Sequence, residues 1–373
     1  QKSYLHSRRN IIMSTVLNSW NDTKNKAEII KFVEKITTQG LDFVPVKDRI
    51  AVFDNDGTLW AERPNYFQVD FIKLQTEGKE SARNVIKPDL SQFPENIRKA
   101  IKDSEGKIDR EGVSFLIDAF QQISTDEYIT KAGEFVKQDH SSISFEDDNQ
   151  SFVRFDAPYI DLTFQPVIEL VQYLQSKEFQ VYICSGGEVD FIRCFAEEVY
   201  GIPPENIIGS TFVRLFDQKD GGVLVRKPIL GQYNDTIGKP SGIELHVGKR
   251  PIIAVGNSSG DYRMFQYTSA EKDKSLIVLI NHDDEEREYC YNNVPYAIDD
   301  DNEPLNQSLD HAQDHENWLV VSMKDDFKAI FENNPPRLSA SKSKVAKTSI
   351  PLELSTIIQQ LDKIVDKLKD LCN

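Results

Sequence analysis

The sequence has little positive charge for its length. Its 373 residues carry 44 Lys and Arg against 60 Asp and Glu, a formal net charge of −16. A nucleic-acid surface needs clustered Lys and Arg to neutralise phosphates, so this balance argues against nucleic acid as a partner. The sequence also lacks a run of the roughly 18 apolar residues that would cross a membrane. Its first twenty residues are basic without a long apolar core, so we expect no secretory signal, and either a cytoplasmic protein or export by another route.

The motifs of several enzyme classes are absent as well. The four cysteines, Cys184, Cys194, Cys290 and Cys372, have no CxxC spacing, which favours free thiols over disulfides or a zinc site. The six histidines show no HExxH spacing. The chain has neither a GxxxxGK phosphate loop nor a GxSxG nucleophile turn. These absences argue against zinc enzymes, P-loop nucleotidases and Ser-His-Asp hydrolases.

The segment IAVFDNDGTLW is the most informative feature that is present. Ile50–Phe53 is a short apolar run, typical of a buried strand in a parallel sheet, and Asp54 and Asp56 follow it directly. Ligands bind at the carboxyl ends of parallel strands, so both carboxylates would reach a site. One can act as a nucleophile and the other as a proton donor, with a hard cation screening their charge. Taken alone, the segment also fits an Asp-Gly turn without any chemistry.

Alternation of strands and helices predicts an α/β fold with a Rossmann-like parallel sheet. An amphipathic helix at Ala27–Gln39 precedes the first strand. Beyond residue 159 the alternation resumes, with helices and strands expected at Pro166–Ser176, Gln180–Cys184, Glu188–Tyr200, Pro251–Val255, Asp261–Tyr267, Ser275–Ile280, Leu319–Met323 and Asp325–Phe331. Residues 16–62 and 159–331 are therefore predicted to form the catalytic core.

Residues 63–158 differ from the core in their sequence pattern, because they contain polar helical segments and no apolar run typical of a strand. This predicts a helical cap, with helices that include Asp126–Asp139. Its aromatic residues are expected to form the cap's own core, with a lining of the site entrance as the alternative; they are Tyr66, Phe67, Phe115, Phe120 and Tyr128.

The last segment, 338–373, is predicted to be an appendage: a basic linker followed by an amphipathic helix with an apolar stripe. Such a helix can dock on an anionic membrane surface or pair with a partner helix. Its polar face carries acids as well as lysines, which favours helix pairing.

Polar clusters follow two further predicted strands and would meet Asp54 at one edge of the sheet. Ser185 and the amides of Gly186 and Gly187 can hold phosphoryl oxygens, although the same residues also suit a flexible turn. Thr58 can donate to the same phosphate. In GNSSGD, Asn257 and Asp261 offer oxygen ligands that suit Mg2+.

A cation is also expected at this edge, to balance Asp54 and a phosphoryl group. Lys239, in a loop bounded by Gly and Pro, is the preferred candidate, and Lys227 is the competitor.

The motifs DNDGT, SGG, GKPSGI and GNSSGD, in this order, resemble the haloacid dehalogenase-like superfamily in its phosphoserine-phosphatase-like branch, over about residues 16–331. The stretches WAERP, EEVYGIPPENIIGS and VVSMKDDFKAIF are similar to those of bacterial hydrolases of this group. The resemblance implies a Rossmann-like core with a cap inserted after the first motif. It further implies Asp54 as nucleophile and Asp56 as general acid and base, Ser185 and Lys239 as phosphate binders, and Asn257 and Asp261 in a loop beside the metal.

Two departures from the family pattern bear on the chemistry. Asn257 stands where the branch often has Asp, so either the metal would bind more weakly or Asp261 would carry more of the metal binding. Glu188 stands where bacterial relatives tend to have Gly, and a carboxylate near the phosphate would alter the preferred leaving group.

These features predict a Mg2+-dependent phosphomonoester hydrolase that forms an aspartyl-phosphate on Asp54, with Asp54, Asp56, Asn257 and Asp261 around the metal. Its substrate would be a phosphorylated small molecule or a phosphopeptide. The main alternative is a protein phosphotyrosine phosphatase whose tail targets a membrane or partner, as in a translocated bacterial effector. A phosphomutase and an inactive scaffold remain further alternatives.

Overall fold

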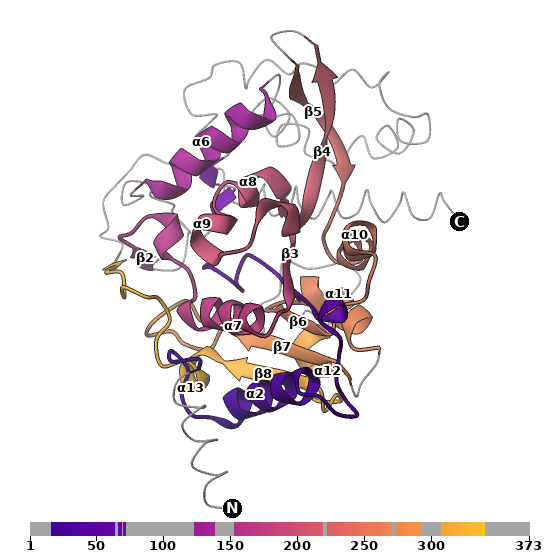
Figure 1. Ribbon diagram of the computed structural model, residues 1–373. Coiled ribbons are helices and arrows are strands. Elements are labelled where there is room, and N and C mark those ends of the chain that lie inside the picture. The colour runs from indigo at the N-terminus through magenta and orange to yellow at the C-terminus, as the bar shows by residue number, and fades with distance from the viewer. Residues whose placement is uncertain are drawn as a thin grey trace, which may run out of the picture.

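A seven-stranded sheet forms the centre of the molecule (Figure 1). This computed structural model describes residues 16–63, 66–68, 70–71, 123–138, 153–218, 222–270, 274–291 and 307–339. The strand order is β5-β4-β3-β1-β6-β7-β8, and every neighbouring pair is parallel except β4 with β5. The strands are β1 (Ile50–Phe53), β3 (Gln180–Glu188), β4 (Ile207–Asp217), β5 (Val223–Gln232), β6 (Ile253–Gly256), β7 (Leu276–Asn281) and β8 (Trp318–Ser322). The predicted α/β fold with a mostly parallel sheet is confirmed.

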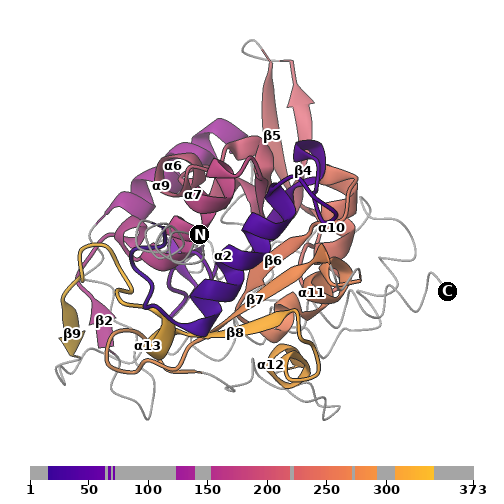
Figure 2. The same ribbon diagram turned by 60° about the horizontal axis from the view of Figure 1, so that its bottom comes forward.

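Helices cover both faces of this sheet, as Figure 2 shows. Successive strand residues point to opposite faces, so Ala51 and Phe53 of β1 pack on one side and Val52 on the other. The first face is covered by α2 (Lys24–Thr37) and α7 (Gln165–Ser176). The second is covered by α10 (Gly238–Val247), α11 (Tyr262–Thr268) and α12 (Gln307–Ala312). All four residues of β1 are buried, which explains its unbroken apolar sequence.

The predicted helices exist but differ at their ends. α2 begins three residues before the expected Ala27, because the Thr23 side chain accepts a hydrogen bond from the Lys26 amide and caps the helix. The expected helix at Glu188–Tyr200 is two short helices, α8 (Val189–Arg193) and α9 (Ala196–Tyr200), since Phe195 has a non-helical backbone. The helix expected at Asp325–Phe331 is mostly wrong, because α13 spans Met323–Asp326 and overlaps it only at Asp325 and Asp326.

The long hairpin of β4 and β5 was not predicted from the sequence; it extends beyond the sheet toward α6 (Thr125–Lys137) in Figure 1. Pro228 lies within β5, and proline in a run argues against a central strand. β5 is in fact the edge strand of the sheet. The prediction that Lys239 lies in a loop is also wrong, because this residue belongs to the first turn of α10.

The described part of the predicted cap packs through aromatic rings. α6 confirms the helix expected at Asp126–Asp139. Phe67 and Tyr128 are buried, and Tyr66 is half-buried. Phe67 packs edge-on against Trp60 with ring centroids 4.7 Å apart. Phe115 and Phe120 lie outside the described residues, as do most of the cap's expected helices.

A short strand, β2 (Val153–Phe155), lies in the segment expected to be free of strands and pairs antiparallel with β9 (Arg337–Ser339). The tail beyond residue 339 is outside the described residues, so the amphipathic helix stays a prediction. Among the cysteines described, Cys184, Cys194 and Cys290 are free thiols, as expected; Cys372 is not described. None of the described helices combines the length and apolar character needed to cross a bilayer.

Candidate active site

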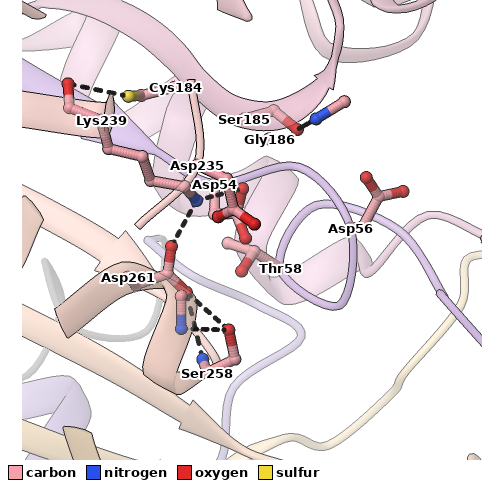
Figure 3. A network of polar contacts seen from close by, with 12 residues as sticks. Asp54, Asp56, Thr58, Cys184, Ser185, Gly186, Asp235, Lys239, Ser258 and Asp261 are labelled. Carbon is pink, nitrogen blue, oxygen red and sulfur yellow. Dashed lines mark hydrogen bonds and ion pairs between the residues drawn. The ribbon is translucent and has the colours of Figure 1, made fainter. Parts of the chain in front are cut away.

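The polar clusters that follow β1 and β6 meet the one at the end of β3 at the carboxyl edge of the sheet (Figure 3). The Ser185 cluster was expected to follow its strand but is part of it, because β3 continues to Glu188. Asp54 directly follows β1, and its amide donates to the Val255 carbonyl at 2.9 Å, which continues the pairing with β6. Asn257 directly follows β6. Ser185 lies in β3, where the register with β4 shifts between Cys184 and Glu188.

Lys239 is the central cation of the site. Its side chain is 2% exposed, and its Nζ lies 2.8 Å from Asp54 Oδ1 and 2.6 Å from Asp261 Oδ1. Although burial opposes it, the carboxylates of Asp261, Asp54 and Asp235 raise the pKa of Lys239 well above its usual value. Lys239 is therefore charged and orients Asp54. The competing candidate, Lys227, lies on β5 in the hairpin.

The two oxygens of Asp261 are both engaged within the protein. Oδ1 accepts from Lys239, while Oδ2 accepts from the amides of Asn257 at 2.9 Å and Ser258 at 3.1 Å. Asp261 therefore links the cation to the GNSSGD turn.

Asp54 is a buried acid beside the ion pair of Lys239 and Asp261. Burial raises its pKa well above the usual value, Asp261 raises it further, and Lys239 opposes the shift. One carboxylate oxygen, Oδ1, is oriented by Lys239. A buried, oriented carboxylate of this kind suits a nucleophile, because little water competes for it.

Asp56 lies apart from the ion pair, with its carboxylate turned away from Lys239 in Figure 3. Its Oδ1 accepts a hydrogen bond from Trp60 Nε1 at 2.8 Å. Burial and the nearby Glu62 raise the pKa of Asp56 to about 6, against the hydrogen bond from Trp60. A carboxyl group with such a pKa can both give and take a proton near neutral pH.

The Ser185-Gly186-Gly187 segment faces Asp56 and one cap residue. A Cβ built on Gly187 would lie 3.3 Å from Ser185 Oγ, 3.4 Å from Gln68 Oε1 and 3.6 Å from Asp56 Oδ2. These side chains therefore surround one small region. Gln68 is fixed there, because its Oε1 accepts from the Glu188 amide at 2.9 Å.

Glu188 does not face this region, contrary to the expectation that it would influence the leaving group. Its carboxylate accepts from the amides of Asp190 and Phe191 at 3.0 Å each, which caps α8. It also pairs with Arg226 Nη1 of the hairpin at 2.9 Å. The side chain thus ties β5 to the end of β3.

Thr58, in the segment after β1, contacts Asn257, which follows β6. The Thr58 hydroxyl donates to Asn257 Oδ1 at 3.2 Å, and Asn257 Nδ2 donates to Glu62 Oε1 at 3.3 Å. Glu62 is 3% exposed, a buried acid that was not placed in the site from the sequence.

Asp235 is a second acid that was not predicted from the sequence. Asp235 follows β5. Because β5 was not predicted, the sequence did not indicate that this acid lies after a strand end. Burial raises its pKa, with Lys239 opposing. A Cβ on Gly186 would come 2.9 Å from Asp235 Cγ, so only glycine fits beside this carboxyl group.

The donor set at this edge consists of oxygen atoms. Within the described residues, no three His, Cys, Asp or Glu side chains are placed together as a metal site. The carboxylate of Asp54 and the carboxamide of Asn257 nevertheless offer oxygen atoms at this edge. The acids there exceed the cations, with Asp54, Asp235 and Asp261 around Lys239. Mg2+ binds few protein groups and prefers such oxygens, so these residues fit it.

Replacing Lys239 with Met is expected to lower the free energy of unfolding by about 3–5 kcal/mol, because Asp54 and Asp261 would lose their buried counter-charge. Urea denaturation measures this. Lys249→Met is the matched control, since Lys249 pairs with Asp48 at the surface and should cost at most about 0.5 kcal/mol. Equal losses in both variants would contradict the assignment of Lys239 as the central cation.

Comparison with known proteins gives only distant likenesses. No protein-family model matches the chain, and no curated protein matches it. Three similar solved structures are a conserved protein of unknown function from Anaerococcus prevotii (15% identity, 69% of this chain and 86% of that one, TM-score 0.43), a phosphoserine phosphohydrolase-like protein from Francisella tularensis (18%, 62% and 87%, 0.34), and a probable phosphoserine phosphatase from Vibrio cholerae (15%, 70% and 65%, 0.31). Scores and identities this low carry no argument about function, which rests on the geometry of the site.

Proposed function

We propose that this chain is a phosphomonoester hydrolase of the haloacid dehalogenase-like superfamily, in its phosphoserine-phosphatase-like branch. The observation that carries the proposal is the buried Asp54–Lys239–Asp261 arrangement, with a second carboxyl group, Asp56, whose pKa is raised to about 6. One carboxylate is held by a cation, and the other accepts a hydrogen bond from Trp60 and is able to exchange protons. This division of labour suits a nucleophile and a general acid.

In the first step, Asp54 attacks the phosphorus of the substrate. Lys239 holds Oδ1, which leaves Oδ2 for the attack. A bond forms between Oδ2 and phosphorus while the bond from phosphorus to the leaving oxygen breaks, and Asp56 gives its proton to that oxygen. In the second step, Asp56 takes a proton from water as the water oxygen bonds to phosphorus. The Asp54 carboxylate is then released together with inorganic phosphate.

Phosphoryl oxygens would be held by the residues that surround this position. We assign Ser185 as a hydroxyl donor, the Gly186 amide as a backbone donor, and Lys239 as the charge that offsets the transferring group. Thr58 is assigned as a second hydroxyl donor, and its hydrogen would have to leave Asn257 Oδ1, its acceptor in this structure, to reach the phosphate.

The proposed cofactor is Mg2+, held by Asp54, the main chain of Asp56 and Asn257. When bound, it would supply positive charge that screens Asp54 from the phosphate. Asp261 would contribute by holding Lys239 and the Asn257 turn, because both of its oxygens are already engaged. This arrangement keeps the four predicted metal-site residues but gives Asp261 an indirect role.

The substrate class we propose is a phosphorylated small molecule or phosphopeptide, chosen by the cap. Gln68, which reaches the region beside Asp56 and Ser185, is the described cap residue best placed to contact it. The alternative of a phosphotyrosine phosphatase gains no support from Phe67 and Tyr128, since both rings are in the core. A tail that targets a membrane surface or partner helix, and the cellular compartment, remain separate proposals.

Hydrolysis of para-nitrophenyl phosphate tests the proposal. We expect turnover in the presence of Mg2+ and its loss after chelation, with activity restored by added Mg2+. Mg2+ should also raise the melting temperature of the protein, because it offsets the excess of buried carboxylates. Turnover that is equal with and without chelator would contradict the metal assignment, and no turnover of any phosphomonoester would contradict the function.

A further inference from the structure

His282 and Glu288 form a buried pair that the proposed reaction does not use. His282 directly follows β7, and its ring Nδ1 lies 3.0 Å from Glu288 Oε2. The two side chains are 2% and 0% exposed. On its other side, His282 Nε2 lies 2.7 Å from the carbonyl oxygen of Gly57, next to Asp56 in the DNDG segment. The pair therefore connects the end of a distant strand to the loop that carries the proposed nucleophile and acid.

The direction of these hydrogen bonds follows from chemistry. A carbonyl oxygen can only accept, so Nε2 of His282 carries a hydrogen and donates it to Gly57. One further proton lies between Nδ1 and Glu288, either as imidazolium with carboxylate or as neutral imidazole with carboxylic acid. In both forms the Nε2–H group stays directed at Gly57. The ring plane is also fixed, because it stacks on Tyr291 at 4.3 Å and meets the edge of Phe164 at 5.6 Å.

The acceptor is a peptide group that is held from both ends. Its carbonyl, from Gly57, accepts from His282, and its N–H, from Thr58, donates to the Asn55 carbonyl at 3.1 Å. Gly57 has a left-handed backbone with φ of 68°, and a Cβ there would come 2.9 Å from Glu62 Cδ. Without a donor at its carbonyl, the peptide would be held only through the Thr58 N–H, and glycine permits more rotation of its plane than other residues do.

We propose that His282, oriented by Glu288, is a positioning residue that fixes the Gly57–Thr58 peptide and thereby the placement of Asp56 and Thr58. The proposal rests on the proposed function for its kinetic part only. We expect the loss of His282 to cost about as much activity as the loss of a group that orients a metal ligand, which is about 10–100-fold.

Four variants test this proposal. His282→Phe keeps an aromatic ring beside Tyr291 but removes the donor, and His282→Gln restores an N–H group at the position of Nε2. Glu288→Leu removes the partner of Nδ1, while Glu288→Gln can still donate to it from its amide. His311→Gln is the control, because His311 is an exposed histidine that stacks on Tyr262. Melting temperatures show which variants fold.

We expect kcat for para-nitrophenyl phosphate to fall about 10–100-fold in His282→Phe and Glu288→Leu, and much less in His282→Gln and Glu288→Gln. Amide hydrogen exchange over residues 54–60 should be faster in the first two variants and near that of the wild type in the other two. Equal kcat and exchange in His282→Phe and the wild type would overturn the proposal, as would equal losses in the conservative and disruptive variants. If no phosphomonoester is hydrolysed at all, the exchange data still decide the role of His282, and the proposed function alone fails.

Discussion

Asp54→Asn is expected to lower kcat for phosphomonoester hydrolysis by at least about 10⁴-fold, because an amide oxygen cannot replace the carboxylate as nucleophile. Lys239 would still be paired with Asp261, so the rest of the site should keep its arrangement. The matched control is Asp48→Asn, which removes a surface carboxylate just before β1 and should leave kcat unchanged. A loss of kcat much smaller than this in purified Asp54→Asn would contradict the mechanism.

The same substitution should make the metal-free protein more stable near neutral pH. Burial and Asp261 raise the pKa of Asp54 in the folded state above its value in the unfolded chain. The carboxyl group therefore favours folding below the unfolded pKa, and this contribution is lost as the pH rises through the folded pKa. An uncharged amide at this position would not suffer that loss. Urea denaturation with chelator should show a gain for Asp54→Asn at about pH 7.5 that disappears in acid, whereas a loss of stability near neutral pH would contradict this account of the site.

Asp56→Asn is expected to slow hydrolysis to a degree that depends on the leaving group. An alkyl phosphate needs a proton on its departing oxygen, so its kcat should fall about 10²–10⁴-fold. para-Nitrophenolate leaves without a proton, so the first step with its phosphate should be nearly unaffected. The second step still needs a base, and a phosphorylated enzyme should therefore accumulate. Rapid-quench kinetics with both substrates measure this difference.

An equal loss in the rate of the first step with both leaving groups would mean that Asp56 does not act as the acid, whereas the shared second step slows both substrates in either case. Trp60 donates to Asp56 and opposes the rise in its pKa, so the geometry of this carboxyl group depends on a neighbour in the same loop. Circular dichroism and melting temperature should therefore be recorded for Asp56→Asn, with Asp48→Asn again as control.

The centre of the sheet was predictable because its strands are short and apolar. Ile50–Phe53 has the predicted bounds, since every residue of β1 is buried on both faces. The expected parallel direction of the strands supplied the rest, because polar residues at the carboxyl ends of parallel strands meet at one edge of the sheet. Asp54, Ser185 and Asn257 could therefore be grouped without any knowledge of contacts.

The periphery of the site was less predictable, because it depends on pairing between distant segments. Asp235 follows β5, an edge strand that contains Pro228. The strand was not predicted from the sequence, so nothing indicated that Asp235 lies near a strand end. His282 follows β7, yet a single histidine after a strand has no motif, and its partner Gly57 is 225 residues away. For Glu188, the sequence led to a wrong prediction. Its position after Ser185-Gly186-Gly187 predicted a carboxylate near the phosphate, but Arg226 of the hairpin binds that carboxylate instead.

The most direct test of the central claim is mass spectrometry of Asp56→Asn after rapid acid quench during turnover of para-nitrophenyl phosphate. The account predicts that the peptide containing Asp54 gains the mass of one phosphoryl group, that the modification maps to Asp54, and that it is absent from the Asp54→Asn/Asp56→Asn double variant. A phosphoryl group on another residue, or phosphate release with no modified peptide at any time point, would contradict the aspartyl-phosphate mechanism.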